Sequence, residues 1–211
     1  MIKNIIFDIG GVLVNFSWEK FIGKIFSDEN PELVRRAAVA VESNWDSLDA
    51  GEDPDEVIAK MIACAPDCEK QIRYWFSRVG ESISKRDTSI PLIQNLKSRG
   101  YNVYYLSNYS HYVMYKNPAA LDFLPYTDGG VFSCDIHITK PDRRIYETLA
   151  KKYNLVPSEC VFIDDLQTNI DGAKAFGFEG ILFRNYEQAV NDLNALLKSK
   201  CAYNNSCSQT F

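Results

Sequence analysis

The side chains best suited to chemistry in this sequence lie in short polar clusters, each directly after an apolar run. The clusters and the runs before them are Asp8 after residues 2–7, Ser107 and Asn108 after 101–106, and Asp164 and Asp165 after 160–163. Runs of this length and composition predict buried strands. If these strands are parallel, their carboxyl ends meet at one edge of a sheet, where ligands bind. We therefore expect these side chains to form one site.

This combination of groups favours binding and transfer of a phosphoryl group. Several carboxylates at one edge repel one another unless a cation joins them, and hard oxygen ligands suit Mg²⁺. Lys140, in a loop before a predicted helix, would bind phosphate oxygens together with the Ser107 hydroxyl. Asp8 could attack phosphorus and form an aspartyl phosphate. Taken alone, each residue is better explained as a cap, a turn or a solvated surface group, so only their joint placement favours a site.

The rest of the sequence supplies the elements that would position these groups. After residue 85, strand patterns alternate with amphipathic helical patterns, which predicts an α/β fold with a doubly wound parallel sheet. The preceding stretch contains four helical patterns and no convincing strand, so we interpret it as an all-helical insertion. The predicted organisation is a core of residues 1–16 and 85–198, a helical cap of residues 17–84, and a flexible tail of residues 199–211.

The composition restricts the partners of the protein. The chain has 211 residues, of which 46% are hydrophobic and 24% charged, as in ordinary globular proteins. A formal net charge of −5 argues against nucleic acid or an anionic membrane as the main partner. No apolar run approaches the roughly 20 residues of a membrane span, and the N-terminus lacks a signal-peptide pattern. We therefore expect a cytoplasmic protein, and nothing indicates an obligate protein partner.

Four motifs, taken together and in this order, resemble those of the haloacid dehalogenase-like (HAD) hydrolase superfamily: FDIGGVLV, LSN, KPD and FIDDLQTN. The resemblance covers residues 2 to about 197, and the helical insertion resembles the C1-type cap of that superfamily. It implies a Rossmann-like core and a Mg²⁺-dependent hydrolase of a small phosphorylated metabolite. The segments SNYSHYV, ITKPDRRIYE and VFIDDLQTNIDGAKAFG are also similar to a smaller group that includes bacterial α-glucose-1-phosphate phosphatases.

The resemblance also implies a role for each candidate residue. These roles are nucleophile for Asp8; substrate binding for Ser107, Asn108 and Lys140; magnesium ligation for Asp8, Asp165 and the backbone carbonyl of Gly10; and direct, water-mediated or supporting contacts to the metal for Asp164 and Asn169. Most phosphatases of this superfamily have a second Asp two residues after the nucleophile as general acid/base. Gly10 occupies that position here and supplies no proton, so we expect the rate to depend steeply on the pKa of the leaving group.

Three functions stay open at this point. The leading one is a Mg²⁺-dependent phosphomonoesterase that acts through an aspartyl phosphate on Asp8, with a sugar phosphate as one candidate substrate. The second is a phosphate-ligand binder without turnover, because Gly10 lacks the acid. The third is a 2-haloacid dehalogenase, which needs no metal and therefore leaves Asp164 and Asp165 unexplained. His111 could lend a proton, although packing or capping explains it better.

The cap contains three tryptophans, for which the sequence predicts different places. Trp18 and Trp75 fall on apolar helix faces, which predicts that they belong to the core of the cap. Trp45 lies in the polar segment ESNWDSLDAGED. We therefore expect Trp45 to be the cap tryptophan that faces the active site.

Overall fold

The centre of the computed structural model, which describes the fold of residues 1–207 and the side chains of residues 1–199, is a five-stranded parallel sheet. Its strand order is β5-β4-β1-β6-β7. The strands are β1 Asn4–Phe7, β4 Asn102–Ser107, β5 Gly129–Phe132, β6 Cys160–Asp164 and β7 Glu179–Leu182. The predicted parallel α/β sheet is therefore confirmed, and the continuous apolar runs reflect burial of both faces.

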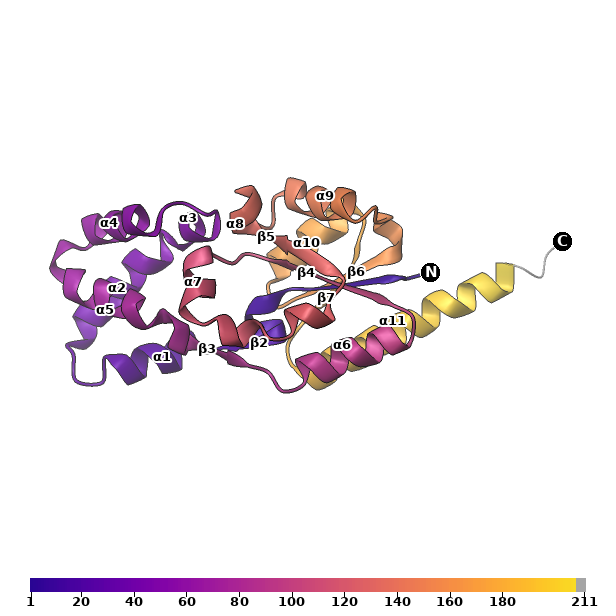
Figure 1. Cartoon of the computed structure of the whole chain (residues 1–211), viewed down its shortest axis with the longest axis horizontal. Helices are drawn as coiled ribbons and strands as arrows, with labels where there is room; N and C mark the ends of the chain where they lie inside the picture. The colour runs from indigo at the N-terminus through magenta and orange to yellow at the C-terminus, as the bar shows by residue number, and fades with distance from the viewer. Residues whose placement is uncertain (208–211) are drawn as a thin grey trace.

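Alternate side chains of β1 enter two different apolar cores. Ile5 and Phe7 pack into the core on one face of the sheet, and Ile6 packs into the core on the other. Helices α6 and α11 cover the first face, and α9 and α10 cover the second, as Figure 1 shows. These helices are α6 Ser89–Ser98, α9 Arg143–Lys152, α10 Gln167–Phe176 and α11 Tyr186–Cys207.

The site residues meet because β1 lies at the centre of the sheet, between β4 and β6. Phe7, the last residue of β1, pairs with Tyr105 of β4 and with Ile163 of β6. The amide of Asp8 continues this pairing and donates to the Ile163 carbonyl at 2.8 Å. The residues that follow these three strands consequently lie at one edge. Figure 1 shows the N-terminus at the opposite end of the sheet, so this edge faces the helical insertion.

Residues 17–84 form mainly a helical cap with an apolar core of its own, at the left of Figure 1. Its helices are α1 Trp18–Ile25, α2 Pro31–Glu42, α3 Trp45–Asp49, α4 Pro54–Cys64 and α5 Glu69–Arg78. Asn30 and Asp53 cap α2 and α4, each by accepting hydrogen bonds from backbone N–H groups of the first turn. Trp75 is fully buried in this core, as predicted.

The structure corrects the predicted elements at three places. A short antiparallel pair, β2 Val14–Phe16 and β3 Ile83–Lys85, joins the cap to the core, although no strand was predicted within 17–84. Helix α3 was missed because five residues leave no amphipathic pattern. Helix α11 runs on to Cys207, into the segment 199–211 that was predicted to be a flexible tail; residues 208–211 lie outside the described part of the chain.

Short helical segments complete the fold. They are η1 Ile9–Leu13, η2 Pro66–Cys68, η3 Val79–Ser82, α7 His111–Lys116, η4 Pro118–Leu121, η5 Leu124–Tyr126, α8 Ser133–Ile136 and η6 Pro157–Glu159. Within residues 1–207, none of the helices combines the length and apolar character needed to cross a bilayer.

Candidate active site

A cavity of about 360 Å³ lies between the carboxyl edge of the sheet and the cap. Its lining residues are Asp8, Gly10, Val14, Phe16, Trp45, Asp46, Asp49, Ile83, Asn108, Tyr109, Ser110, Val113, Lys140, Asp165, Leu166 and Asn169. Most of the predicted site residues are among them. The other two, Ser107 and Asp164, are fully buried beside this edge. The structure thus brings all the predicted site residues together.

Lys140 forms the centre of the polar network. Its Nζ donates to Asp8 Oδ1 at 2.7 Å and to Asp164 Oδ2 at 2.6 Å, and its side chain is 1% exposed. Burial alone would lower the pKa of Lys140, but the charges of Asp8 and Asp164 outweigh it and raise the pKa. Burial raises the pKa of Asp8, and the charge of Lys140 opposes this increase. The lysine therefore stays cationic and fixes the position of the Asp8 carboxylate.

Asp164 is held by further hydrogen bonds at the end of β6. Its Oδ1 accepts from the backbone N–H of Leu166 at 2.8 Å, and Asn169 Nδ2 lies 3.1 Å from both carboxylate oxygens. With Lys140 on Oδ2, both oxygens of Asp164 have protein partners. Asp164 therefore orients Lys140, and Asn169 in turn orients Asp164.

Ser107 and Asn108 differ in whether their side chains already have hydrogen-bond partners in the protein. The Asn108 side chain accepts from the backbone N–H of Lys140 at 2.7 Å and donates to its carbonyl at 3.1 Å, which ties the lysine loop to β4. The Ser107 hydroxyl is buried and makes no hydrogen bond within 3.5 Å to a described residue, although it lies near enough to Asp8 to help lower the pKa of that carboxyl group. Because buried hydroxyls normally have a partner, Ser107 is suited to bind an oxygen of a ligand.

Three carboxylates at this edge could hold a divalent cation. Asp8, Asp164 and Asp165 each place a carboxylate oxygen within 4.8 Å of the others. Burial, together with the charges of Asp8 and Asp164, raises the pKa of Asp165 to about 6. A cation among these groups would offset their repulsion, and an all-oxygen donor set fits Mg²⁺. Since both oxygens of Asp164 are occupied, Asp8, Asp165 and the Gly10 carbonyl are the better candidates for ligands.

The loop after β1 is shaped to approach Asp165 closely. Gly11 has a left-handed backbone conformation with φ of 72°, and a Cβ there would overlap with Asp165 Oδ2. Only glycine fits this position without displacing the carboxylate. Gly10 differs, because its φ of −61° suits any residue and a Cβ there would meet no atom within 4 Å.

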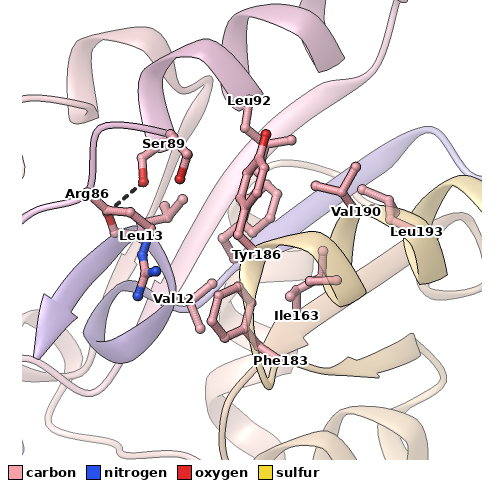
Figure 2. Close-up of a pocket in the computed structure, with 13 residues that line it drawn as sticks. Val12, Leu13, Arg86, Ser89, Leu92, Ile163, Phe183, Tyr186, Val190 and Leu193 are labelled. Carbon is pink, nitrogen blue, oxygen red and sulfur yellow. Dashed lines mark hydrogen bonds between the residues drawn. The ribbon is translucent and has the colours of Figure 1, made fainter.

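This loop is also supported from the side away from the cap. Arg86 donates to the Gly11 carbonyl at 2.8 Å, and Ser89 Oγ donates to the Leu13 carbonyl at 2.7 Å. Figure 2 shows these residues beside an apolar wall that includes Phe183 and Tyr186. The loop that carries Gly10 is consequently held by both hydrogen bonds and packing.

The cap contributes residues that the sequence reasoning missed. Asp49, at the end of α3, is 7% exposed and lines the cavity. The sequence did contain an indication of this, because Asp49 lies in the same polar segment as Trp45, which does line the cavity as expected.

In the core, Tyr109 was also not predicted as a site residue; its buried hydroxyl has no hydrogen-bond partner among the described residues. His111 is exposed, lies 2.8 Å from Asp135 and does not line the cavity.

Comparison with known proteins agrees with this architecture. Residues 2–177 match the family of haloacid dehalogenase-like hydrolases. The chain belongs to this family. The match covers the three strand ends, the lysine loop and the cap, so this HAD-like hydrolase has the family's fold over most of its length.

A relative with a phosphatase name is more similar in sequence to this chain than the solved dehalogenase is. The D-ribitol-5-phosphate phosphatase of Bacteroides thetaiotaomicron is 27% identical over 94% of this chain and 100% of its own length. A solved HAD family enzyme from the same organism, in complex with magnesium and inorganic phosphate, has a TM-score of 0.63 at 20% identity, over 86% of this chain and 94% of that one. An L-2-haloacid dehalogenase from Xanthobacter autotrophicus has a TM-score of 0.60 at 15% identity, over 90% and 81%. At these identities the two structures show a shared fold.

Proposed function

We propose that this HAD-like hydrolase is a Mg²⁺-dependent phosphomonoesterase that acts through an aspartyl phosphate on Asp8. The observation that carries the proposal is the bridge of Lys140 between Asp8 and Asp164, beside the buried Ser107 hydroxyl, which makes no hydrogen bond within 3.5 Å to a described residue. A cation and a hydroxyl next to a positioned carboxylate suit a phosphoryl group, since they bind its oxygens while the carboxylate faces phosphorus.

The reaction has two displacements at phosphorus. In the first, a carboxylate oxygen of Asp8 forms a bond to phosphorus, and the bond from phosphorus to the leaving oxygen breaks. In the second, water attacks the same phosphorus, and inorganic phosphate and the Asp8 carboxylate are released. Lys140 and Ser107 bind the equatorial oxygens in both steps. Magnesium, held by Asp8, Asp165 and the Gly10 carbonyl, would supply further positive charge next to the phosphoryl group.

We propose a sugar or polyol phosphate as the substrate. The cavity of about 360 Å³ matches a small metabolite, and Phe16 and Trp45 line it with aromatic rings suited to the apolar face of a sugar. The activity named for the ribitol-phosphate relative supports the same class. Action without a nucleic acid or an obligate protein partner, and a cytoplasmic location, stay predictions from the sequence.

The proposal is tested by phosphate release from a panel of phosphorylated sugars and polyols at varied magnesium. We expect turnover that EDTA abolishes, and we expect Asp8→Asn to lower kcat by more than about 10³-fold because an amide is a poor nucleophile. Melting curves of Asp8→Asn control for folding. An Asp8→Asn variant that keeps wild-type turnover would assign the chemistry elsewhere.

The magnesium ligands are tested separately with Asp165→Ala. We expect the magnesium concentration for half-maximal rate to rise at least about tenfold, since even outer partners of metal ligands contribute that much. Asp171→Ala, which removes an exposed carboxylate from α10, is the matched control. An unchanged magnesium requirement in Asp165→Ala would remove this residue from the ligand set.

The phosphate-binding alternative rests on one observation, the absence of a carboxyl group at Gly10. Calorimetry with inorganic phosphate and magnesium distinguishes it, because a binder would show saturable binding and no phosphate release from any ester. The dehalogenase alternative predicts chloride release from 2-chloropropionate in the presence of EDTA.

A further inference from the structure

A phosphatase with glycine at position 10 needs its proton donor from elsewhere in the cavity. The titratable residues that line the cavity, within the described part of the chain, are Asp8, Asp46, Asp49, Tyr109, Lys140 and Asp165. Asp8 and Lys140 are joined in the ion pair, and Asp165 is a metal-ligand candidate. The remaining candidates are therefore Asp46, Asp49 and Tyr109.

Asp49 differs from Asp46 in burial. Asp49 is buried, with 7% of its surface exposed, whereas Asp46, three residues earlier on α3, is exposed. No Lys, Arg or His of the described residues forms a salt bridge with Asp49. A carboxyl group that is nine-tenths buried without a cationic partner favours its protonated form, which is the form that can donate a proton.

The backbone around Asp49 is attached to the core at two points. Ser133 Oγ of α8 donates to the Asp49 carbonyl at 2.5 Å and accepts from the Tyr109 N–H at 3.0 Å. The Nδ1–H of His137 donates to the Ala50 carbonyl at 2.8 Å. These bonds fix Asp49 above the edge of the sheet, where α3 lies beside α8 in Figure 1.

Gly51 allows this close attachment. Its φ is 83°, and a Cβ there would lie 2.7 Å from the Cys134 carbonyl oxygen. The chain therefore passes against α8 directly after Asp49, in a conformation that favours glycine. Asp49 is positioned by the contact between cap and core, rather than by the cap alone.

We propose, on the basis of the proposed function, that Asp49 is the general acid and base that Gly10 cannot supply. Asp8 attacks from the floor of the cavity, so an in-line displacement sends the leaving oxygen toward the cap, where Asp49 lies. In the first step the carboxyl O–H of Asp49 gives its proton to the leaving oxygen as the bond to phosphorus breaks. In the second step the Asp49 carboxylate takes a proton from the attacking water, which restores the acid.

The charges around Asp49 are consistent with this role. Burial, together with the charges of Asp46 and Asp8, raises the pKa of Asp49 to about 8, while Lys140 and the Trp45 indole lower it. The neutral groups Tyr109 and Cys134 also lie close enough to be affected by its charge. The acid is consequently present at neutral pH, near the value at which proton transfer in both directions is effective.

The test compares two leaving groups in wild type and Asp49→Asn. Acetate leaves from acetyl phosphate as a stable anion, whereas a sugar or polyol alkoxide needs a proton. We expect Asp49→Asn to lower kcat/KM for the best alkyl phosphate, ribitol 5-phosphate included, by about 10²–10⁴-fold. We expect its kcat/KM for acetyl phosphate to change less than about tenfold. In wild type, kcat/KM for the alkyl ester should fall at high pH as Asp49 loses its proton, and this fall should disappear in Asp49→Asn.

Two further variants sharpen this comparison. Asp46→Asn removes a carboxylate from the same helix, and its effects on the two substrates should differ far less than those of Asp49→Asn. Gly10→Asp places a carboxyl group where a Cβ meets no atom within 4 Å. In the Asp49→Asn background, Gly10→Asp should raise kcat/KM for the alkyl ester at least about tenfold. An acid contributes about 10²–10⁴-fold, so this recovery lies within the expected range. Melting temperatures show whether each variant folds.

Each outcome decides a different question. Equal losses on both substrates in folded Asp49→Asn would overturn the acid/base role and leave the phosphatase proposal intact. A wild-type protein that hydrolyses acetyl phosphate but no alkyl phosphate would overturn it as well, and this result does not depend on any variant. Absence of phosphate release from every ester would contradict the proposed function itself.

Discussion

The two sides of the cavity are built in different ways. We call the core side, with Asp8, Lys140 and Asp164, the floor, and the cap side, with Asp49 of α3, the roof. On the floor, Lys140, Asp8 and Asp164 share short hydrogen bonds and are almost completely buried. On the roof, the carboxyl group of Asp49 forms no salt bridge with a described residue, and only its backbone is attached to the core. The floor therefore fixes side chains, whereas the roof fixes the path of the chain and leaves the side chain available.

This difference corresponds to two kinds of chemistry. Groups that bind a charged phosphoryl group act by electrostatics and benefit from fixed positions. A group that gives and takes a proton must change its own charge, so a permanent ion pair with a cation would hold it in one state. We expect variants of the floor to affect stability and every substrate, and variants of the roof to discriminate between substrates.

The largest effect is expected from Lys140→Met. Without the ammonium group, Asp8 and Asp164 are left as adjacent buried carboxyl groups, so we expect the free energy of unfolding to fall by about 3–5 kcal/mol at neutral pH. Activity should be lost with every ester. Urea denaturation without magnesium measures the stability, and Lys151→Met, which removes an exposed partner of Glu147, is the control and should change little. A stable Lys140→Met protein would show that the floor does not depend on this ion pair.

A smaller effect is expected from Ser133→Ala, which breaks the attachment of the roof. The change leaves the Tyr109 N–H without its acceptor, and we expect a loss of about 1–3 kcal/mol of stability. Because the Asp49 carbonyl also loses its donor, kcat/KM should fall further for an alkyl phosphate than for acetyl phosphate. Ser98→Ala, on the exposed surface of α6, is the matched control. Equal losses on both substrates would separate Ser133 from the positioning of Asp49.

A further prediction concerns how the stability of the magnesium-free protein depends on pH. The pKa of Asp49 is about 8 in the folded state and near 3.9 in an unfolded chain. The folded state therefore binds more protons between these values, and stability falls as pH rises through this window. Asp49→Asn lacks that loss, so its melting temperature relative to wild type should increase from pH 5 to pH 9. A constant difference would show that Asp49 titrates normally.

The floor of the site was largely predictable from the sequence. Asp8 directly follows one apolar strand, Ser107 and Asp164 are the last residues of two others, and parallel strands must align their carboxyl ends. The partners of these groups were less predictable. Asn108 was expected to bind substrate, which stays a prediction, and the structure adds that its amide holds the loop of Lys140 through two backbone groups of that loop.

The roof was not predictable in the same way. Helix α3 has five residues and no repeating apolar face, so nothing in its local pattern indicates that it forms or where it lies. The strands β2 and β3 are equally short, and their pairing joins residues far apart in the sequence. Such elements depend on tertiary contacts rather than on local propensity.

By itself the sequence determined the sheet, the helical insertion and the chemical groups at the strand ends, because strand and helix periodicity are local properties. Only the tertiary structure decided which of these groups have partners and which carboxyl group faces them from the cap. The burial of Asp49, the absence of a salt bridge between it and any described residue, and the open space at Gly10 all depend on contacts between residues far apart in the sequence. The missing carboxyl group is visible in the sequence at position 10, but the residue that could replace it is visible only in the fold.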